Sequence, residues 1–114
     1  MNSMISTESL SGMIKVMPMQ GRIDAATVNK NKEQMIENFI DHNGPIVLNL
    51  QDVSFVDSTG LGMLVTLHKM QVELGQPMVL CEMADQVRLL LELTRLNLVF
   101  DIYDNQSSAL ESLG

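Results

Sequence analysis

The sequence predicts an α/β fold in which helices cover a β-sheet. Short apolar runs typical of strands alternate along the chain with segments in which apolar residues recur at helical spacing. Glycine, proline and asparagine separate consecutive segments, as expected at turns. Strands that alternate with helices form βαβ units, whose right-handed crossovers place the helices against the sheet. The alternation therefore predicts a sheet built from such units.

The first quarter of the chain is predicted to contribute two strands. Residues 1–11 are expected to form a first strand behind a frayed end. Residues 13–20 form the next strand, in which Pro18 indicates an edge position or a bulge because proline lacks the N–H that a central ladder needs. Gly21 then marks a turn.

A helix and a buried strand follow. Asp24 is placed to cap the helix, whose apolar residues recur at helical spacing opposite a charged face. Asn43, Gly44 and Pro45 end it. Residues 46–50 are almost wholly apolar, as expected for a central parallel strand covered on both faces.

The second half continues the alternation. A helix over residues 61–74 ends at Gly75, and residues 78–81 form the next strand. An amphipathic helix then ends at Asn97, and residues 99–103 form the last strand. Ser108 and Glu111 have the spacing of a capping box, which predicts a short terminal helix.

Composition limits the function. At 114 residues the chain is long enough for a single core, so one domain is expected over residues 1–114. A net charge of −7 without any Lys/Arg run argues against nucleic acid and anionic membranes. No apolar run approaches the ~20 residues that membrane insertion requires, and residues 1–10 lack signal-peptide features. Cys81 is the only cysteine, so no internal disulfide is expected, which favours a cytoplasmic protein.

The most informative segment is residues 53–62, with the sequence VSFVDSTGLG. It joins a strand to a helix, so Ser58 is predicted to cap the helix with its Oγ at the positive end of the helix dipole. A phosphate added there would meet exposed backbone N–H groups. We therefore predict that Ser58 is a phosphorylation site. Thr59 is a candidate second acceptor, and the favoured alternative is that it only fills the start of the helix. Capping alone is the simpler alternative for Ser58.

The neighbours of Ser58 allow two interpretations each. Asp57 either orients Ser58 or a partner's group, or competes as the helix cap. Gly60 and Gly62 each cost about 1 kcal/mol of helix stability relative to alanine. Retaining both indicates close approach by a partner or tight packing on the sheet. Since loops after successive parallel strands gather at one edge of a sheet, Asp24 and Ser58 are expected to lie together there.

The helix of residues 61–74 has a wide apolar arc. Its apolar residues occupy two neighbouring faces, one with Leu61, Leu64, Val65 and Val72, the other with Met63, Leu67, Met70 and Leu74. Such an arc is wider than one contact with a sheet needs. One face is expected to pack on the sheet. The other either meets a partner beside Ser58 or is buried under a neighbouring helix, and burial is the favoured alternative.

Several of these segments together resemble one family. They are GRIDA at residues 21–25, the strand at 46–50, DSTGLG at 57–62, GQPMVL at 75–80 and FDIY at 100–103. The chain resembles a STAS domain of the anti-anti-sigma-factor type over roughly residues 10–113. The resemblance implies a small mixed β-sheet with helices mainly on one face. Asn49 departs from the family pattern, because many relatives carry an aspartate there.

The resemblance also implies partners. Ser58 takes the position of a serine that an anti-sigma factor or switch kinase phosphorylates and a PP2C-like phosphatase dephosphorylates. Asp24 matches an acidic position near the partner-binding surface. The expected partner is an anti-sigma factor or serine kinase of the histidine-kinase-like ATPase type, bound when Ser58 is unmodified and released after phosphorylation. The predicted partner-binding residues are Asp24, Asp57, Ser58, Thr59, Gly60, Leu61, Gly62 and Met63.

No pattern of catalytic residues supports an enzyme. Val56 stands where a nucleophile elbow needs glycine, and neither a P-loop nor a dinucleotide-binding motif occurs. His42 is expected to be solvated, and His68 to be a buried or boundary histidine whose ring nitrogens are hydrogen-bonded. Cys81 is expected to be an inert core residue. These residues lack the spacing of metal ligands, so no metal and no cofactor are predicted. The alternative to a phospho-switched binding protein is an accessory subunit of a lipid or anion transporter complex.

Overall fold

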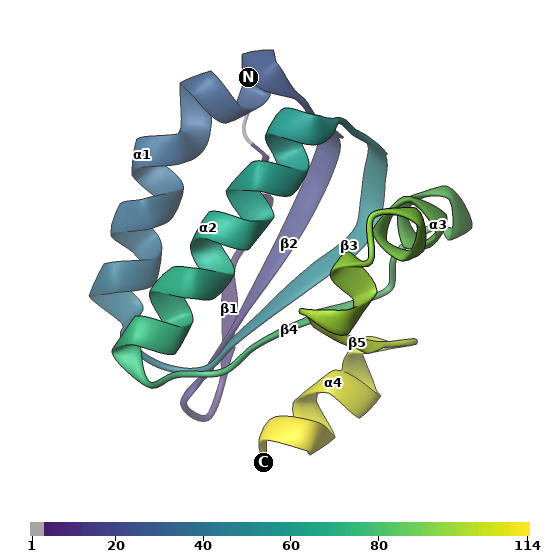
Figure 1. Ribbon diagram of the computed structural model, residues 1–114. Coiled ribbons are helices and arrows are strands. Elements are labelled where there is room, and N and C mark those ends of the chain that lie inside the picture. The colour runs from purple at the N-terminus through teal and green to yellow at the C-terminus, as the bar shows by residue number, and fades with distance from the viewer. Residues whose placement is uncertain (1–3) are drawn as a thin grey trace.

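The computed structural model describes residues 4–114, which contain one five-stranded sheet and four α-helices (Figure 1). The strands lie in the order β1 (Ser9–Ser11), β2 (Ile14–Ile23), β3 (Ile46–Val56), β4 (Met78–Cys81) and β5 (Asp101–Tyr103). β1 is antiparallel to β2, and all other neighbours are parallel. The helices are α1 (Ala25–His42), α2 (Ser58–Leu74), α3 (Asp85–Leu93) and α4 (Gln106–Leu113), with a 3₁₀ turn, η1, at Leu96–Leu98.

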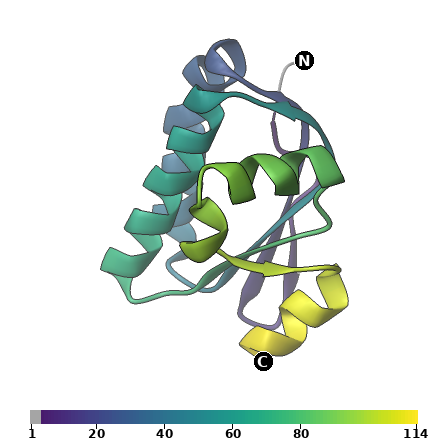
Figure 2. The ribbon, with the colours of Figure 1, turned by 45° about the vertical axis from the view of Figure 1, so that its right-hand side comes forward.

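The helices lie mainly on one face of the sheet, as predicted. α1, α2 and α3 cover one face, and α4 lies against the other near the C-terminus (Figure 2). Phe39, Leu64 and Leu67 are fully buried in the larger core between the sheet and its helices. Ala109 of α4 packs in a smaller cluster with strand residues that include Val47.

β3 shows why the apolar run at residues 46–50 predicts a covered strand. Ile46, Leu48 and Leu50 alternate toward the larger core, while Val47 turns to the α4 side. Asn49 also contacts α4, because its side-chain amide donates a 2.8 Å hydrogen bond to Oε1 of Gln106. The strand continues to Val56, beyond the predicted end.

β2 is longer than predicted and is not an edge strand. It lies between β1 and β3, so the edge interpretation of Pro18 is wrong, whereas the bulge is confirmed by a register shift between Pro18 and Gln20. Gly21 does not form a turn between elements. It lies inside β2 with φ of 74°, next to a second register shift, in a conformation that favours glycine.

α2 is buried along both of its predicted apolar faces near its start. Leu61 and Leu64 pack in the core, and Met63 and Leu67 are equally buried, with α1 lying alongside α2 (Figure 1). The favoured alternative, burial of the second face under a neighbouring helix, is therefore confirmed for these two residues. Val72 was expected on a packed face but is 64% exposed.

Gln71 takes a buried place in α2 that sequence periodicity did not assign. Only 1% of Gln71 is exposed. Its Nε2 donates to the carbonyl oxygens of Gly44 at 3.0 Å and Pro77 at 3.1 Å, which lie in the turns before β3 and β4. These bonds satisfy the amide nitrogen of Gln71, whereas its Oε1 is buried and accepts no hydrogen bond from residues 4–114.

The C-terminal elements begin and end differently from the predictions. α3 ends at Leu93, and β5 is limited to Asp101–Tyr103. Asn105 caps α4 by accepting a 2.8 Å hydrogen bond from the N–H of Ser108, so the capping box at Ser108 is wrong. Over residues 4–114, the structure contains no helix with the length and apolar character needed to cross a membrane.

Candidate functional site

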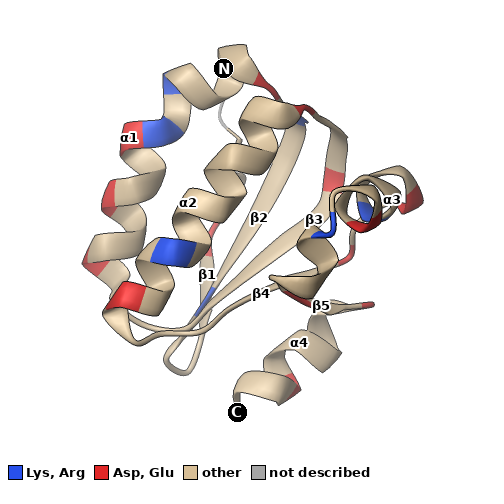
Figure 3. Ribbon diagram, in the orientation of Figure 1, with Lys and Arg blue, Asp and Glu red and all other residues tan. Residues whose placement is uncertain are grey.

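The strands β2 and β3 end side by side and lead into α1 and α2. Ile23 is paired with Val56 in parallel register, and the next residues begin the two turns. Acidic residues mark both turns in Figure 3. Asp24 and Ser58 therefore lie at the same edge of the sheet, as the topology predicted.

Asp57, not Ser58, caps α2. The backbone of Asp57 is extended, and its Oδ1 accepts a 2.8 Å hydrogen bond from the N–H of Gly60. The predicted cap role of Ser58 is thus wrong. Aspartate and serine cap helices about equally well, and here the position one residue earlier takes the role. Ser58 becomes the first residue of α2 and is exposed, as is Thr59.

Asp57 also links the two turns. Its Oδ2 accepts a 3.2 Å hydrogen bond from the N–H of Ala25, the first residue of α1. Its own N–H donates to the carbonyl oxygen of Ile23 at 3.2 Å. One aspartate thus contacts the starts of both helices.

The two glycines of the motif have different surroundings. A Cβ at Gly60 would overlap the carbonyl oxygen of Ile23, so this position needs glycine for close packing against the β2–α1 turn. At Gly62 a Cβ would meet nothing within 4 Å, and the residue is exposed. Packing within the chain therefore explains Gly60 and leaves Gly62 unexplained.

Asp24 caps α1 through a capping box with Thr27, as its position predicted. Its Oδ1 accepts from the N–H of Thr27 at 3.1 Å, and the Thr27 hydroxyl accepts from the N–H of Asp24 at 3.0 Å. Arg22 Nε donates to the other carboxylate oxygen at 3.0 Å. The Thr27 N–H and then Arg22 hold the pKa of Asp24 below its ordinary value.

Arg22 and Phe55 are surface residues of this edge that the sequence did not single out. They are paired across β2 and β3, and the guanidinium carbon of Arg22 lies 4.2 Å from the centre of the Phe55 ring. Phe55 remains 39% exposed. The β2–β3 register, which brings them together, is not visible in either segment alone.

The eight predicted partner-binding residues divide by exposure. Ser58, Thr59 and Gly62 are exposed, and Asp24 and Asp57 are half-buried. The others are buried in α2, namely Gly60, Leu61 and Met63. All eight belong to the two turns and the first turns of α2, so the structure brings them together at one edge.

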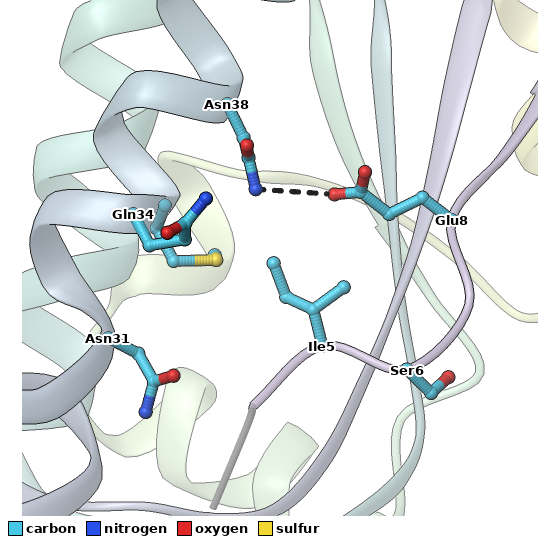
Figure 4. A pocket seen from close by; sticks show the side chains of 7 residues that line it. Ile5, Ser6, Glu8, Asn31, Gln34 and Asn38 are labelled. Atoms are coloured by element: carbon cyan, nitrogen blue, oxygen red, sulfur yellow. Dashed lines mark hydrogen bonds between the residues drawn. The ribbon is translucent and has the colours of Figure 1, made fainter.

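The surface has one hollow near this edge and another away from it. One is lined by the end of β3 and by α3, including Phe55 and Leu90. The other separates α1 from the N-terminal segment (Figure 4), where Asn38 donates to a carboxylate oxygen of Glu8 at 3.5 Å. The second hollow contains none of the predicted site residues.

The histidines and the cysteine lie apart from the two turns. His42 is half-buried rather than solvated, and its Nε2 lies 3.0 Å from the carbonyl oxygen of Pro45. His68 lies at the boundary, one of the two predicted positions, and makes an edge-to-face contact with Phe100. Its Nδ1 is buried without a hydrogen-bond partner in the described part of the chain, so the expected satisfaction of the ring is wrong. Cys81 is buried as predicted, and burial raises the pKa of its thiol to about 12. Over residues 4–114, no three His, Cys, Asp or Glu side chains are grouped as metal ligands would be.

Comparison with known proteins finds a matching family profile and a relative of similar length. The STAS domain profile matches residues 5–109. The anti-sigma F factor antagonist of Paenibacillus polymyxa is 32% identical over 117 residues, which cover 99% of this chain and 97% of that protein.

Solved structures share the fold. A candidate anti-sigma factor antagonist from Thermotoga maritima has a TM-score of 0.87 at 25% identity, covering 94% of this chain and 92% of that one. The Bacillus cell fate determinant SpoIIAA in its phosphorylated form has a TM-score of 0.71 at 15% identity, covering 96% and 99%. The second likeness shows the fold alone. With a family profile and a relative that each span nearly its whole length, the chain belongs to the STAS domain family.

Proposed function

We propose that this chain is an anti-sigma factor antagonist whose binding is switched by phosphorylation of Ser58. The observation that carries the proposal is an exposed Ser58 at the start of α2, where Asp57 already provides the cap. The Ser58 hydroxyl is therefore not needed to hold the helix. The name of the Paenibacillus polymyxa relative supports the antagonist role.

The proposed partner is an anti-sigma factor or serine kinase of the histidine-kinase-like ATPase type. The kinase transfers the γ-phosphoryl group of ATP to Ser58 Oγ, and ADP and the hydroxyl proton are released. A PP2C-like phosphatase then uses water to cleave the phosphoester, which restores the hydroxyl and releases inorganic phosphate. Thr59, the next exposed residue, is a candidate second acceptor.

Charge explains the proposed switch. A phosphate adds roughly −1.5 to −2 charge at pH 7. On Ser58 it would lie at an edge that already carries Asp24 and Asp57. The start of α2 can accept the charge because the helix dipole is positive there. The fold is therefore expected to survive, while a partner packed on Ser58 loses contact through repulsion and the cost of burying the charge. SpoIIAA, which has the same fold, is known in unphosphorylated and phosphorylated forms.

The direct contact surface in this proposal is formed by Asp24, Ser58, Thr59 and Gly62. Gly62 has open space around it, which suits the close approach of a partner's backbone. Asp57, Gly60, Leu61 and Met63 act in the same binding site from beneath, by holding the first turns of α2 in place.

Binding of purified anti-sigma factors from the source organism tests the proposal. Wild type and Ser58→Ala should bind one of them, and Ser58→Asp should bind it at least about tenfold more weakly, a loss of ~1.4 kcal/mol in binding free energy. Ser107→Asp is the matched control, because it places the same charge on an exposed residue in the first turn of α4. Equal binding by Ser58→Asp and wild type would contradict the switch.

Incubation with the bound kinase and ATP tests the modification itself. Phosphopeptide mapping should find phosphate on Ser58 in the wild type and none there in Ser58→Ala. Genes for a kinase and a PP2C-like phosphatase beside the gene for this chain would favour the proposal, whereas transporter genes would favour an accessory subunit of a transporter complex.

A further inference from the structure

Three separate contacts join the β2–α1 turn to the β3–α2 turn. The carboxylate of Asp57 accepts from the N–H of Ala25, and the N–H of Asp57 donates to the carbonyl oxygen of Ile23. Gly60 packs against the same carbonyl so closely that no side chain would fit between them. All three contacts link α2 or its cap to residues on either side of Asp24.

The second carboxylate bond of Asp57 goes beyond what helix capping requires. A cap needs one side-chain oxygen to accept from the third N–H of its helix, and Oδ1 of Asp57 does this with Gly60. Oδ2 is then used for Ala25, which lies 32 residues away in the sequence. Asn105 and Asp24 are useful comparisons, because their cap bonds stay within their own turns.

This arrangement leaves Asp57 poorly suited to contact a partner. Both of its carboxylate oxygens accept hydrogen bonds from backbone N–H groups of the same chain, and the residue is half-buried. What a partner can reach are the side chains on either side of this link, Asp24 and Ser58. The pairing of Ile23 with Val56 brings the two turns to one edge, and the contacts of Asp57 join them there.

We infer that Asp57 is a positioning residue, which fixes the Asp24 turn relative to Ser58 so that a partner meets both as one preformed surface. The inference rests on the proposed function for its effect on affinity. Asp57 then contributes to binding through the Asp24 turn and not through a contact of its own. Preformed surfaces bind more tightly because less conformational freedom is lost on association.

Amide hydrogen exchange of the chain alone tests the link without any partner. In Asp57→Ser, the serine hydroxyl can still cap Gly60, but no second acceptor remains for Ala25. Exchange of the Ala25 N–H is expected to quicken about tenfold, as for the loss of a hydrogen bond to a charged group. Exchange at Gly60 should change less than about threefold, because serine is also a good cap. Asn105→Ser is the matched control and should leave both amides unchanged.

A double-mutant cycle tests the effect on affinity. Asp57→Ser should weaken binding of the anti-sigma factor about tenfold while Gly60 remains protected. Asp24→Asn should then weaken binding less in the Asp57→Ser background than in the wild type, because coupled residues are not additive. A purely structural loss at α2 would leave the effect of Asp24→Asn unchanged.

The outcomes separate the two ideas. Unchanged exchange at Ala25 in Asp57→Ser overturns the link between the turns, whatever binds the chain. Additive losses in the cycle, or full affinity in Asp57→Ser, overturn the positioning role. If the wild type binds none of the anti-sigma factors, the proposed function and the affinity effect fall together, and the Ala25 result still decides the link.

Discussion

Replacing Gly60 with alanine is expected to destabilise the fold, although alanine is the better helix former. The new Cβ would overlap the carbonyl oxygen of Ile23. That oxygen cannot easily move, because it also accepts the hydrogen bond from the N–H of Asp57. Inserting a methyl group into well-packed surroundings costs about 1–3 kcal/mol, and overlap with backbone places this site at the upper end. Helix propensity returns at most about 1 kcal/mol, so a net loss of about 2 kcal/mol is expected.

Gly62→Ala is the matched control in the same turn of α2. Its Cβ would meet nothing within 4 Å, and Gly62 has no positive φ. Alanine there should stabilise the fold by about 0.5 kcal/mol, because it restricts the unfolded chain and favours the helix. The two variants carry the same chemical change two residues apart, so the opposite signs would isolate the contact with Ile23.

Urea unfolding is the assay, with stability compared through the midpoint at a constant m value. For a protein of this size the Gly60→Ala loss corresponds to a fall in Tm of roughly 8 °C. The reasoning is refuted if Gly60→Ala is as stable as the wild type, or if both variants shift stability in the same direction.

Two further predictions concern titrating groups. Cys81 should resist alkylation by iodoacetamide at pH 8 and react only after denaturation, because it is buried and its thiol pKa is raised to about 12. The bonds of Asp24 should stabilise the fold at pH values above the unfolded pKa of about 3.9 and be lost as the pH falls through its lower folded pKa. Urea midpoints between pH 6 and pH 3 should therefore fall more steeply for the wild type than for Asp24→Asn.

Hydrophobic patterning predicted the elements of the core but not their full lengths. Residues 46–50 signal β3 because both faces of that part are covered. The strand then continues through exposed residues such as Asp52 and Phe55, which pair with Gln20 and Arg22 of β2. Pairing depends on register between distant segments, so no local pattern reports it. The same holds for Gly21, which looks like a turn residue and instead lies at a bulge.

The topology predicted the site better than the local chemistry did. Consecutive parallel strands bring Asp24 and Ser58 to one edge whatever their side-chain contacts are. The choice of cap depended on more than propensity, because Asp57 and Ser58 are both suitable residues. Asp57 is the cap, and its second carboxylate oxygen also accepts a hydrogen bond from Ala25. Ala25 comes near Asp57 only in the folded sheet. The pairing of Arg22 with Phe55 was missed for the same reason.

Gln71 gives α2 an attachment at the end opposite to Asp57. Its amide donates to carbonyl groups that precede β3 and β4, whereas Asp57 accepts from N–H groups at the starts of both helices. α2 is thus fastened to both ends of the parallel sheet and acts as a rigid spacer about 25 Å long, at 1.5 Å per residue. We therefore expect a charge added to its first turn to act locally and not to slide or tilt the helix. On that expectation, a protein that bound the opposite end of α2 would stay attached whether Ser58 carried phosphate or not.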